Sequence, residues 1–322
     1  MLADGVLLSG FGGPDCPDAV GPFMRNLTGR DPDPAVLARV KARYERIGGC
    51  SPLALTAREL AAQVRSALAA TGREMPVEVG MRYWHPTIGD AVVALADGGA
   101  KCIAHVSLSP LEAAVTHARY REAIDEAIRA RAGLSTCEAP QLASLDAYRR
   151  LHADALKEAL ESVRSARVLV ALTAHSLPIA DDGAEAYAGE LVNLSRAVAR
   201  EVGFARGHAI EVAQSSTVGD LEGEVSWVVC YQSKGARGGQ WLAPDLGGVI
   251  GQAAGLGFEA VVVAPVGFAL DHMETLYDLD VEARAAAEEE GLTFVRSRVP
   301  NAHPALAKAI AEVVLGLGCD QG

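Results

Sequence analysis

Residues 262–282 read VVAPVGFALDHMETLYDLDVE, and this stretch decides the fold class that the sequence predicts. Its opening residues are apolar and β-branched, which is typical of a strand buried in a parallel sheet. Pro265 and Gly267 end the strand, and a helical pattern starts near Asp271. A helix that begins where a strand ends lies at the carboxyl edge of the sheet, where ligands bind in open α/β folds. We therefore expect a functional site at this strand end.

Three carboxylates, Glu274, Asp278 and Glu282, recur every four residues along the predicted helix. This spacing places them on nearly one face of an α-helix, with a drift of about 40° per step. Ionised neighbours on a helix repel one another, so such a line needs compensating groups. One interpretation is a solvated face with Arg284 and other cations nearby, and the other is a line of oxygen ligands or proton carriers. The position after a strand end, with His272 beside Glu274, favours the second.

Length and charge limit the classes of protein to consider. The 322 residues suffice for two domains with a core each, and the formal net charge is -12 at pH 7. Such a charge argues against a nucleic-acid partner, because no basic stripe would replace counterions. No apolar run approaches the roughly 18 to 20 residues of a membrane span, and the N-terminus lacks a signal-peptide pattern. We expect a cytoplasmic protein without a transmembrane segment.

The six cysteines are scattered, and none forms a C-x-x-C pair. Their spacing suggests neither a disulfide framework nor a zinc or cluster site. We expect most of them to be small buried hydrophobic residues. They are Cys16, Cys50, Cys102, Cys137, Cys230 and Cys319.

The rest of the chain alternates predicted strands and helices, which indicates βαβ units and parallel sheets. The strands expected in the first half are 5–11, 77–83, 101–108 and 139–144, and the helices are 18–27, 34–47, 53–70, 85–95 and 116–131. In the second half the strands are 167–174, 225–231, 260–265 and 293–296, and the helices are 148–163, 184–202, 244–255 and 303–317. The predicted fold class is α/β, with Rossmann-like doubly wound domains at 1–150 and 151–322 that face a central cleft. The last helix, 303–317, is expected to pack back on the body.

Two nucleotide-binding motifs are excluded. Gly10-x-Gly12 follows a strand but lacks the third glycine of a dinucleotide fingerprint, and no P-loop pattern occurs. Two other strand ends carry polar residues: His175 after the strand 167–174, and Gln232 with Trp241 after the strand 225–231. A neutral imidazole that faces a carboxylate can accept a proton or bind a borderline metal near neutral pH. Alternatively, His175 is a hydrogen-bonded structural residue, and Gln232 and Trp241 belong to the core and its rim.

Four groups of residues together resemble the ferrochelatase family, in family order and over almost the whole chain. They are Tyr44-x-x-Ile47-Gly48-Gly49-x-Ser51-Pro52-Leu53, Ala174-His175-Ser176-Leu177-Pro178, Tyr231-Gln232-Ser233 with Trp241-Leu242-x-Pro244-Asp245, and Asp271-His272-x-Glu274-Thr275-Leu276-Tyr277-x-Leu279-Asp280-x-Glu282. With Trp84-His85-Pro86, the sequence is most similar to actinobacterial members regarded as coproporphyrin ferrochelatases. The resemblance implies a chelatase-type fold and a lyase that inserts ferrous iron into coproporphyrin III or protoporphyrin IX in haem biosynthesis.

The resemblance also implies roles for single residues. His175 would accept protons or face the metal, Glu274 would be its partner across the ring, and Asp278 and Glu282 would form an outer acidic path for metal or protons. Which group handles metal and which handles protons stays open. Fe²⁺ is a substrate, and no organic cofactor is implied.

Residues that would line the porphyrin pocket follow from the same resemblance. Guanidinium groups could pair with propionates, although ordinary surface arginines are an equal alternative residue by residue. Phe11 stands where some relatives carry a metal-reaching tyrosine, so it would pack or stack. The expected substrate-binding residues are Phe11, Arg30, Arg43, Ser51, Gln232 and Trp241.

Two departures from the family pattern leave alternatives open. After the strand 101–108 this chain has Leu111-Glu112-Ala113-Ala114 and His117 where relatives carry hydroxyl-bearing and aromatic residues, and Glu112 would repel a propionate. Cys319 is solitary, whereas some actinobacterial relatives use clustered C-terminal cysteines for a two-iron two-sulfur cluster, so no cluster is predicted. The alternatives are a family member retuned for another tetrapyrrole, metal or iron-chelating substrate, and a non-catalytic haem or porphyrin carrier. No heptad seam is present, and we expect a monomer.

Overall fold

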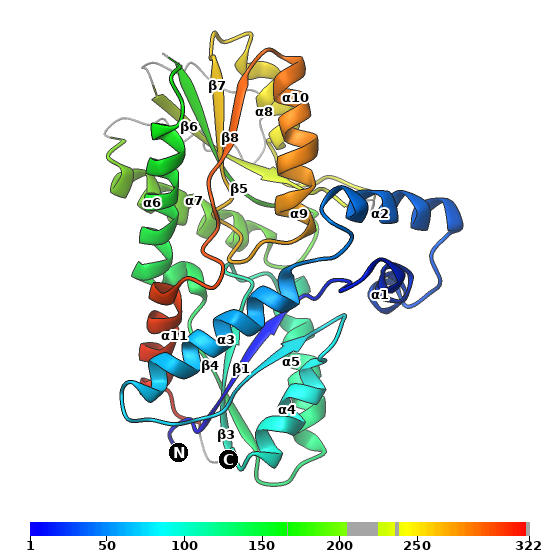
Figure 1. Ribbon diagram of the computed structural model, residues 1–322, viewed down its shortest axis with the longest axis vertical. Coiled ribbons are helices and arrows are strands. Elements are labelled where there is room, and N and C mark those ends of the chain that lie inside the picture. Colours follow the sequence, from blue (N-terminus) through cyan, green and yellow to red (C-terminus); the bar gives the residue numbers. More distant parts are fainter. Residues whose placement is uncertain (166, 205–224, 236–237, 320–322) are drawn as a thin grey trace.

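The computed structural model describes residues 1–165, 167–204, 225–235 and 238–319. Within them the chain forms two four-stranded parallel sheets with helices on both faces (Figure 1). Most strand residues are apolar and buried, as expected for parallel strands that are covered on both sides. The predicted α/β class with two doubly wound halves is confirmed.

The first sheet has the order β2-β1-β3-β4. Leu7 and Ile103 face one group of helices, and Val6 and Leu8 face the opposite core. The strands are β1 (Gly5–Gly10), β2 (Val77–Met81), β3 (Cys102–Ser107) and β4 (Ser135–Glu138). The helices of this half are α1 (Val20–Thr28), α2 (Pro34–Arg46), α3 (Leu53–Ala69), α4 (Ile88–Asp97) and α5 (Ala114–Arg129). This half also has the short 3₁₀ helices η1 (Pro17–Ala19) and η2 (Leu142–Ser144).

The second sheet repeats this arrangement with the order β6-β5-β7-β8. Its strands are β5 (Val168–His175), β6 (Val225–Gln232), β7 (Ala260–Ala264) and β8 (Thr293–Arg296). Its helical elements are α6 (Asp146–Glu161), α7 (Ala184–Val202), α8 (Leu246–Ala253), α9 (Met273–Leu276), η3 (Asp278–Ala283), α10 (Arg284–Glu289) and α11 (Pro304–Gly316).

The common strand order fixes where ligands are expected in each half. In both sheets the strand that comes first in the chain lies between the second and the third, so the strand order reverses beside it. Ligands in open α/β sheets bind at the carboxyl ends of the strands on either side of such a reversal. These ends belong to β1 and β3 in the first half and to β5 and β7 in the second.

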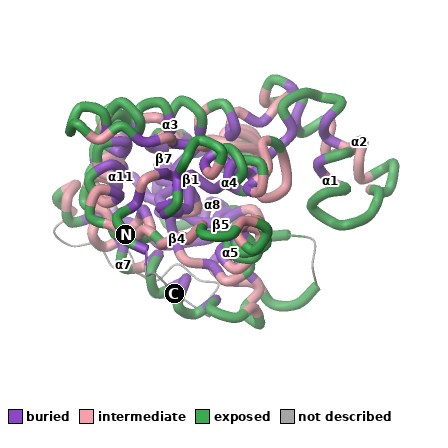
Figure 2. The backbone as a smooth tube through the Cα atoms, turned by 90° about the horizontal axis from the view of Figure 1, so that it is seen from below, coloured by how far each residue is buried: buried purple, intermediate pink, exposed green. Residues whose placement is uncertain are grey.

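Two helices near the N-terminus project from the body. In Figures 1 and 2, α1 and α2 lie to one side of the sheets, and the loop between them is mostly exposed. Val20 and Phe23 supply the buried face of α1, and Tyr44 that of α2. Asp33 caps α2 by accepting hydrogen bonds from the amides of Ala35 and Val36.

The structure corrects the prediction of a strand at 139–144. The fourth strand is β4, four residues earlier, where Cys102 pairs with Ser135 and His105 with Glu138. Pro140 has no amide hydrogen for a sheet ladder, and residues 142–144 form the 3₁₀ helix η2 instead.

The cysteine prediction was also wrong in part. Cys102 and Cys319 form a disulfide, so Cys319 is not solitary. The 217 residues that separate the two cysteines hide the pairing from sequence spacing. Residues 1–3 bring them together, because the amide of Ala3 donates to the carbonyl of Leu317 (3.0 Å).

The boundary between domains at 150/151 stays a prediction. It falls inside α6, which packs on α7 and β7 of the second half. The last helix, α11, packs on α3 of the first half (Figure 1). One buried hydrophobic cluster runs through both halves, from Leu60 on α3 to Leu191 on α7.

Candidate active site

His175 is the last residue of β5, at the carboxyl edge of the second sheet. Its Nδ1 lies against the carbonyl of Ser176, which fixes Nδ1 as the donor. In the neutral ring the lone pair is then on Nε2, which lies 3.6 Å from Oε1 of Glu274. The hydroxyl of Tyr187 donates to the carbonyl of His175 (3.0 Å) and holds the strand end against α7. The ring is therefore held in place with its basic nitrogen toward a carboxylate.

Glu274 lies in the first turn of α9, after β7, and its backbone is anchored on both sides. The side-chain amide of Gln232 donates from Nε2 to the backbone carbonyl of Glu274 (2.8 Å). The hydroxyl of Thr173 donates to Oε1 of Gln232 (2.7 Å), which fixes the orientation of the Gln232 amide. The amide of Glu274 donates to Nδ1 of His272 (3.1 Å). Burial lowers the pKa of His272, which keeps this acceptor neutral. The side chains of His175 and Glu274 are each 33% exposed, so solvent reaches the pair.

The predicted acidic helix contains a π-helical turn. The amide of Glu282 donates to the carbonyl of Tyr277 (3.0 Å), five residues back, within η3. A turn closed by such bonds holds more residues than the 3.6 of an α-helix, so residues four apart drift less than the roughly 40° expected. The wider turn therefore reduces the drift between Asp278 and Glu282, while Glu274 lies in the α-helical turn before it.

Each carboxylate of the line has its own partner. Glu274 faces His175, Asp278 accepts a hydrogen bond from Ser233 (2.5 Å), and Glu282 pairs with Arg43 on α2 (3.1 Å). Burial raises the pKa of Asp278 to about 6, and the charges of Glu274 and Glu282 add to the shift. Asp278 therefore exchanges a proton near neutral pH, which suits a proton carrier better than a permanently charged ligand.

Arg296 holds residues 271–280, the segment that contains Glu274 and Asp278, through two aspartates. It donates to both carboxylate oxygens of Asp280 (2.8 Å each) and to Asp271 (3.2 Å), while Asn301 donates to Asp271 (2.8 Å). Such a bidentate pair gives geometric specificity. Sequence analysis assigned no role to Ser233 or Arg296. Ser233 could have been found as the residue after Gln232, but no sequence signal connects Arg296 with a site fifteen or more residues away.

The matching strand end of the first half is aromatic. Phe11 follows β1, is 39% exposed, and packs against Tyr83 and Phe23, with ring centroids 4.8 and 6.5 Å away. Phe23 in turn contacts Trp84 (6.2 Å). These four rings, which we call the aromatic wall, meet tilted or edge-on, at interplanar angles of 57° to 77°, and form an apolar cluster beside β1 and β2.

The other predicted pocket residues differ in how freely their side chains could contact a substrate. Arg30 is exposed near the start of the loop between α1 and α2. Arg43 is engaged by Glu282 and lies over the ring of Tyr277, 5.0 Å from its centroid. Ser51 is buried against Gly13, and its amide donates to the carbonyl of Pro14 (2.7 Å). As substrate ligands these residues stay predictions.

Gln232 and Trp241 lie on the second half. Gln232 is buried and bonded to Thr173 and Glu274, as described above. Trp241 forms an antiparallel bridge with Pro178, just after His175. Both residues shape the strand ends around His175, and their contact with substrate stays a prediction.

Glu112 is compensated within the protein. Its carboxylate accepts hydrogen bonds from Arg121 and Gln141 (2.8 Å each), and its amide donates to Glu190 on α7 (3.1 Å). The hydrogen bonds and the charges of Arg121 and His117 lower the pKa of Glu112 against the effect of its partial burial. Because its charge is paired with Arg121, the Glu112 carboxylate repels a propionate less than the sequence suggested.

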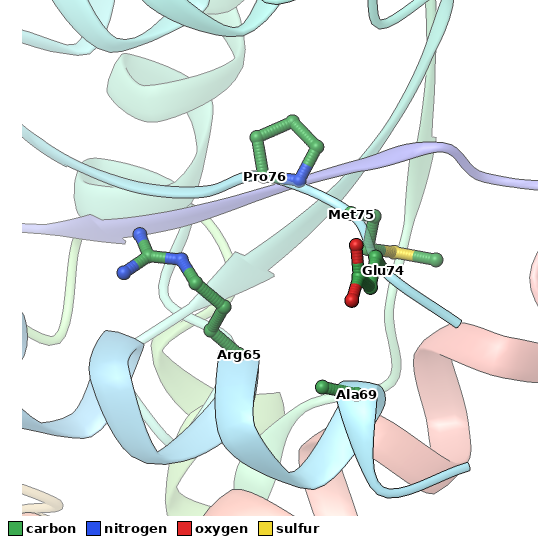
Figure 3. Close-up of a pocket in the computed structure, with 5 residues that line it drawn as sticks. All are labelled: Arg65, Ala69, Glu74, Met75 and Pro76. Carbon is green, nitrogen blue, oxygen red and sulfur yellow. The ribbon is translucent and has the colours of Figure 1, made fainter. Parts of the chain in front are cut away.

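Two surface hollows lie away from these residues. One, of about 420 Å³, lies between α3 and the segment before β2, where Arg65 and Ala69 face Glu74, Met75 and Pro76 (Figure 3). The other, of about 380 Å³, lies where α6 meets the segment before α11. Neither lining includes His175, Glu274 or the aromatic wall.

Solved structures with the same arrangement of two α/β halves define the class of the fold. One described as SirB from Bacillus subtilis with Fe3+ has a TM-score of 0.55 and 15% identity, and the match covers 96% of this chain and 93% of that one. The structure of CbiX, described as the terminal enzyme of sirohaem biosynthesis in denitrifying bacteria, has a TM-score of 0.53 and 14% identity, with 98% and 100% covered. The fold is therefore of chelatase type.

Sequence comparison then gives the family. A family model described as Ferrochelatase matches residues 3–316. Proteins named coproporphyrin III ferrochelatase are 33% identical in Nocardia farcinica (98% of this chain, 88% of the relative) and 35% identical in Mycobacterium avium (99% and 89%). The chain belongs to the ferrochelatase family and is an enzyme of the metal-chelatase class, so the resemblance found from motifs is confirmed. Among the described residues, no helix is both long and apolar enough to cross a membrane.

Proposed function

We propose that this enzyme inserts ferrous iron into coproporphyrin III, as a cytoplasmic step of haem biosynthesis. The observation that carries the proposal is the pair His175 and Glu274, with 3.6 Å between Nε2 and Oε1, at the open strand ends of a ferrochelatase-family chain. The choice of coproporphyrin rests on the names of the similar actinobacterial proteins. No observation on the residues favours a different tetrapyrrole.

His175 accepts the pyrrole protons in this proposal. Metal insertion replaces two N–H hydrogens of the ring, so a base must stand beside the macrocycle. With Nδ1 directed at the carbonyl of Ser176, the basic Nε2 faces Oε1 of Glu274, 3.6 Å away, in a pair that solvent reaches. Glu274 stabilises the imidazolium that forms, because an opposite charge within about 4 Å favours the charged form.

The line from Glu274 through Asp278 to Glu282 gives protons or the incoming ion a route. Hydrated Fe²⁺ exchanges oxygen ligands readily, so carboxylates pass it along without retaining it as thiolates would. Asp278, with a pKa of about 6, binds and releases a proton near neutral pH. Arg43 closes the outer end of the line through its ion pair with Glu282.

The first half holds the macrocycle. The aromatic wall supplies stacking area for a flat apolar ring, and Arg30 is exposed and able to meet a propionate. Arg43 would meet a propionate only by leaving Glu282. Binding energy from these contacts with the periphery can hold a distorted ring that exposes its N–H groups. No organic cofactor is required, and we expect a monomer.

Anaerobic incubation with Fe²⁺ and either coproporphyrin III or protoporphyrin IX tests this function, with metalloporphyrin followed by absorbance. We expect faster insertion into coproporphyrin III, and its loss in His175→Ala. The control is His303→Asn, which keeps a side-chain acceptor at the first turn of α11, where His303 accepts from the amide of Ala305 (3.1 Å). Insertion into protoporphyrin IX alone would contradict coproporphyrin III as the substrate. An active His175→Ala enzyme would contradict the role of His175 as the base.

A further inference from the structure

Three cysteines from distant parts of the sequence meet at the edge of the first sheet opposite the active site. The sulfur atoms of Cys102, Cys137 and Cys319 all lie within 4.8 Å of one another. Cys102 begins β3, Cys137 lies on the neighbouring β4, and Cys319 follows α11. His175 and Phe11 stand at the carboxyl ends of their strands, whereas Cys102 stands at the amino end of its own. The mechanism proposed above uses none of the three thiols.

Backbone contacts hold the cluster together independently of its disulfide. The amide of Cys319 donates to the carbonyl of Met1 (2.9 Å), and Leu2 and Gly318 form an antiparallel bridge. The β3–β4 ladder places Cys137 opposite Ala104, two pairs along from Cys102 and Ser135. Reduction of the Cys102–Cys319 bond therefore leaves three thiols beside one another rather than releasing the segment.

The number of ligands decides which metal centre these residues fit. A two-iron two-sulfur cluster, which the resemblance raised for some relatives, takes four protein ligands. The structure describes all six cysteines, and the other three (Cys16, Cys50 and Cys230) do not belong to this group. Three thiolates fall one short for such a cluster but can hold a single ion that keeps one position for water.

The distances fit a tetrahedral ion. Thiolates about 2.3 Å from zinc lie about 3.8 Å apart, so sulfurs that already lie within 4.8 Å need only small side-chain movements. Cys102 and Cys319 are buried, whereas Cys137 is half-buried, which leaves a path for an ion from solvent. Thiolate ligands favour zinc-like ions over the oxygen-seeking Mg²⁺ and Ca²⁺.

We propose that Cys102, Cys137 and Cys319 form a binding site for one Zn²⁺-like ion in the reduced protein, and that the disulfide is the metal-free oxidised form of this site. A dithiol reductant converts the oxidised form, which has the disulfide, into the reduced form. It transfers two electrons and two protons to the Cys102–Cys319 bond, gives two thiols, and closes into a disulfide itself. The ion then displaces the thiol protons into water. In a reducing compartment, metal binding by cysteine thiolates is more usual than a permanent disulfide.

Cobalt binding tests the site without reference to activity. The full-length protein, reduced with a dithiol and freed of reductant without oxygen, is titrated with Co²⁺, and the sulfur-to-cobalt charge-transfer band is recorded. This band reports thiolate ligands, so an ion bound at His175 and Glu274 does not contribute. We expect one Co²⁺ per chain, displaced by one Zn²⁺, and no band in the oxidised protein.

Variants separate the site from adventitious thiol binding. Cys137→Ser and Cys319→Ser should each lower the affinity for Zn²⁺ by at least about tenfold, since even ligand-supporting residues have effects of that size. Cys16→Ser is the matched control, because Cys16 is an exposed free thiol outside the cluster, and it should leave the titration unchanged. No charge-transfer band in the reduced protein, an unchanged metal affinity in Cys137→Ser, or iron and acid-labile sulfide in anaerobically purified protein would each overturn the proposal.

Discussion

The two halves of the molecule share a strand order but present different chemistry at their strand ends. In the second half, β5 and β7 lead to His175, Glu274 and the acidic line of η3. In the first half, β1 leads to Phe11 and the aromatic wall, and the turn after β3 carries Glu112, which pairs with Arg121 and accepts a hydrogen bond from Gln141. One strand end is built from titratable groups and the other from apolar surface.

The comparison indicates a division of labour. Groups that move protons and ions need adjustable charges, and the second half supplies these, with partners for Glu274 and Asp278 from its own residues and one for Glu282 from Arg43 on α2. Groups that hold a flat macrocycle need apolar area and cations for its propionates, and the first half supplies rings and Arg30. The account therefore predicts that substitutions in the second half impair turnover and those in the first half impair ring binding.

The largest effect is expected at the central pair. His175→Ala and Glu274→Gln should each lower the rate of iron insertion by roughly 100-fold or more, the usual contribution of a positioned acid or base. Porphyrin binding, followed by fluorescence quenching, should change little. Glu312→Gln, in an exposed pair on α11, is the control for the loss of a carboxylate. Equal losses of binding and turnover in Glu274→Gln would remove the distinction between the halves.

A second prediction concerns the protonation of Asp278. Its pKa is raised from 3.8 to about 6 in the folded protein, so the native state holds the proton more tightly than the unfolded state. This contribution to stability is lost as the pH rises through about 4 to 6. Asp278→Asn should therefore raise the free energy of unfolding at pH 8 by about 1 to 2 kcal/mol, and by much less at pH 4.

Urea unfolding of the Asp278→Asn variant at both pH values measures this difference. Asp154→Asn, at an exposed position on α6 beside Lys157, serves as the control and should show no such pH dependence. A gain of the same size at pH 4 and pH 8 would show that burial does not control the charge of Asp278.

The aromatic wall should affect binding more than turnover. Phe11→Ala removes an exposed ring and its contact with Tyr83, which is worth about 1 kcal/mol, or roughly fivefold in porphyrin affinity. Turnover at saturating porphyrin should stay close to that of the wild type. Val93→Ala, at an apolar position of similar exposure on α4, is the control for loss of surface hydrophobicity. A fall in saturated turnover with unchanged affinity would place Phe11 with the catalytic groups.

The smallest effect is expected where the two halves meet. Arg43 on α2 pairs with Glu282 and contacts Tyr277, but both charged side chains are nearly half exposed. Arg43→Ala should lower the free energy of unfolding by less than about 1 kcal/mol, and salt should weaken the effect further. Arg298→Ala, in an exposed pair with Glu158, gives the comparison. A cost of several kcal/mol would make Arg43 a main support of the interface.

Sequence analysis predicted the α/β class, because apolar strands that alternate with amphipathic helices have few other solutions. It also predicted that His175 and Glu274 lie at one sheet edge, since both follow buried strands. The π-turn of η3 escaped prediction, because the i, i+4 spacing of the carboxylates is compatible with both helix types. The partners Ser233 and Arg43 depend on tertiary contacts, and the Cys102–Cys319 disulfide joins residues with no local signal.

The most direct test of the division of labour measures porphyrin affinity and anaerobic Fe²⁺ insertion on the same preparations of wild type, Glu274→Gln and Phe11→Ala. We expect Glu274→Gln to bind coproporphyrin III like the wild type and to insert little iron, and Phe11→Ala to bind it more weakly and to insert iron at a near-normal saturated rate. The opposite pattern, with affinity lost in Glu274→Gln and turnover lost in Phe11→Ala, would contradict this division of labour.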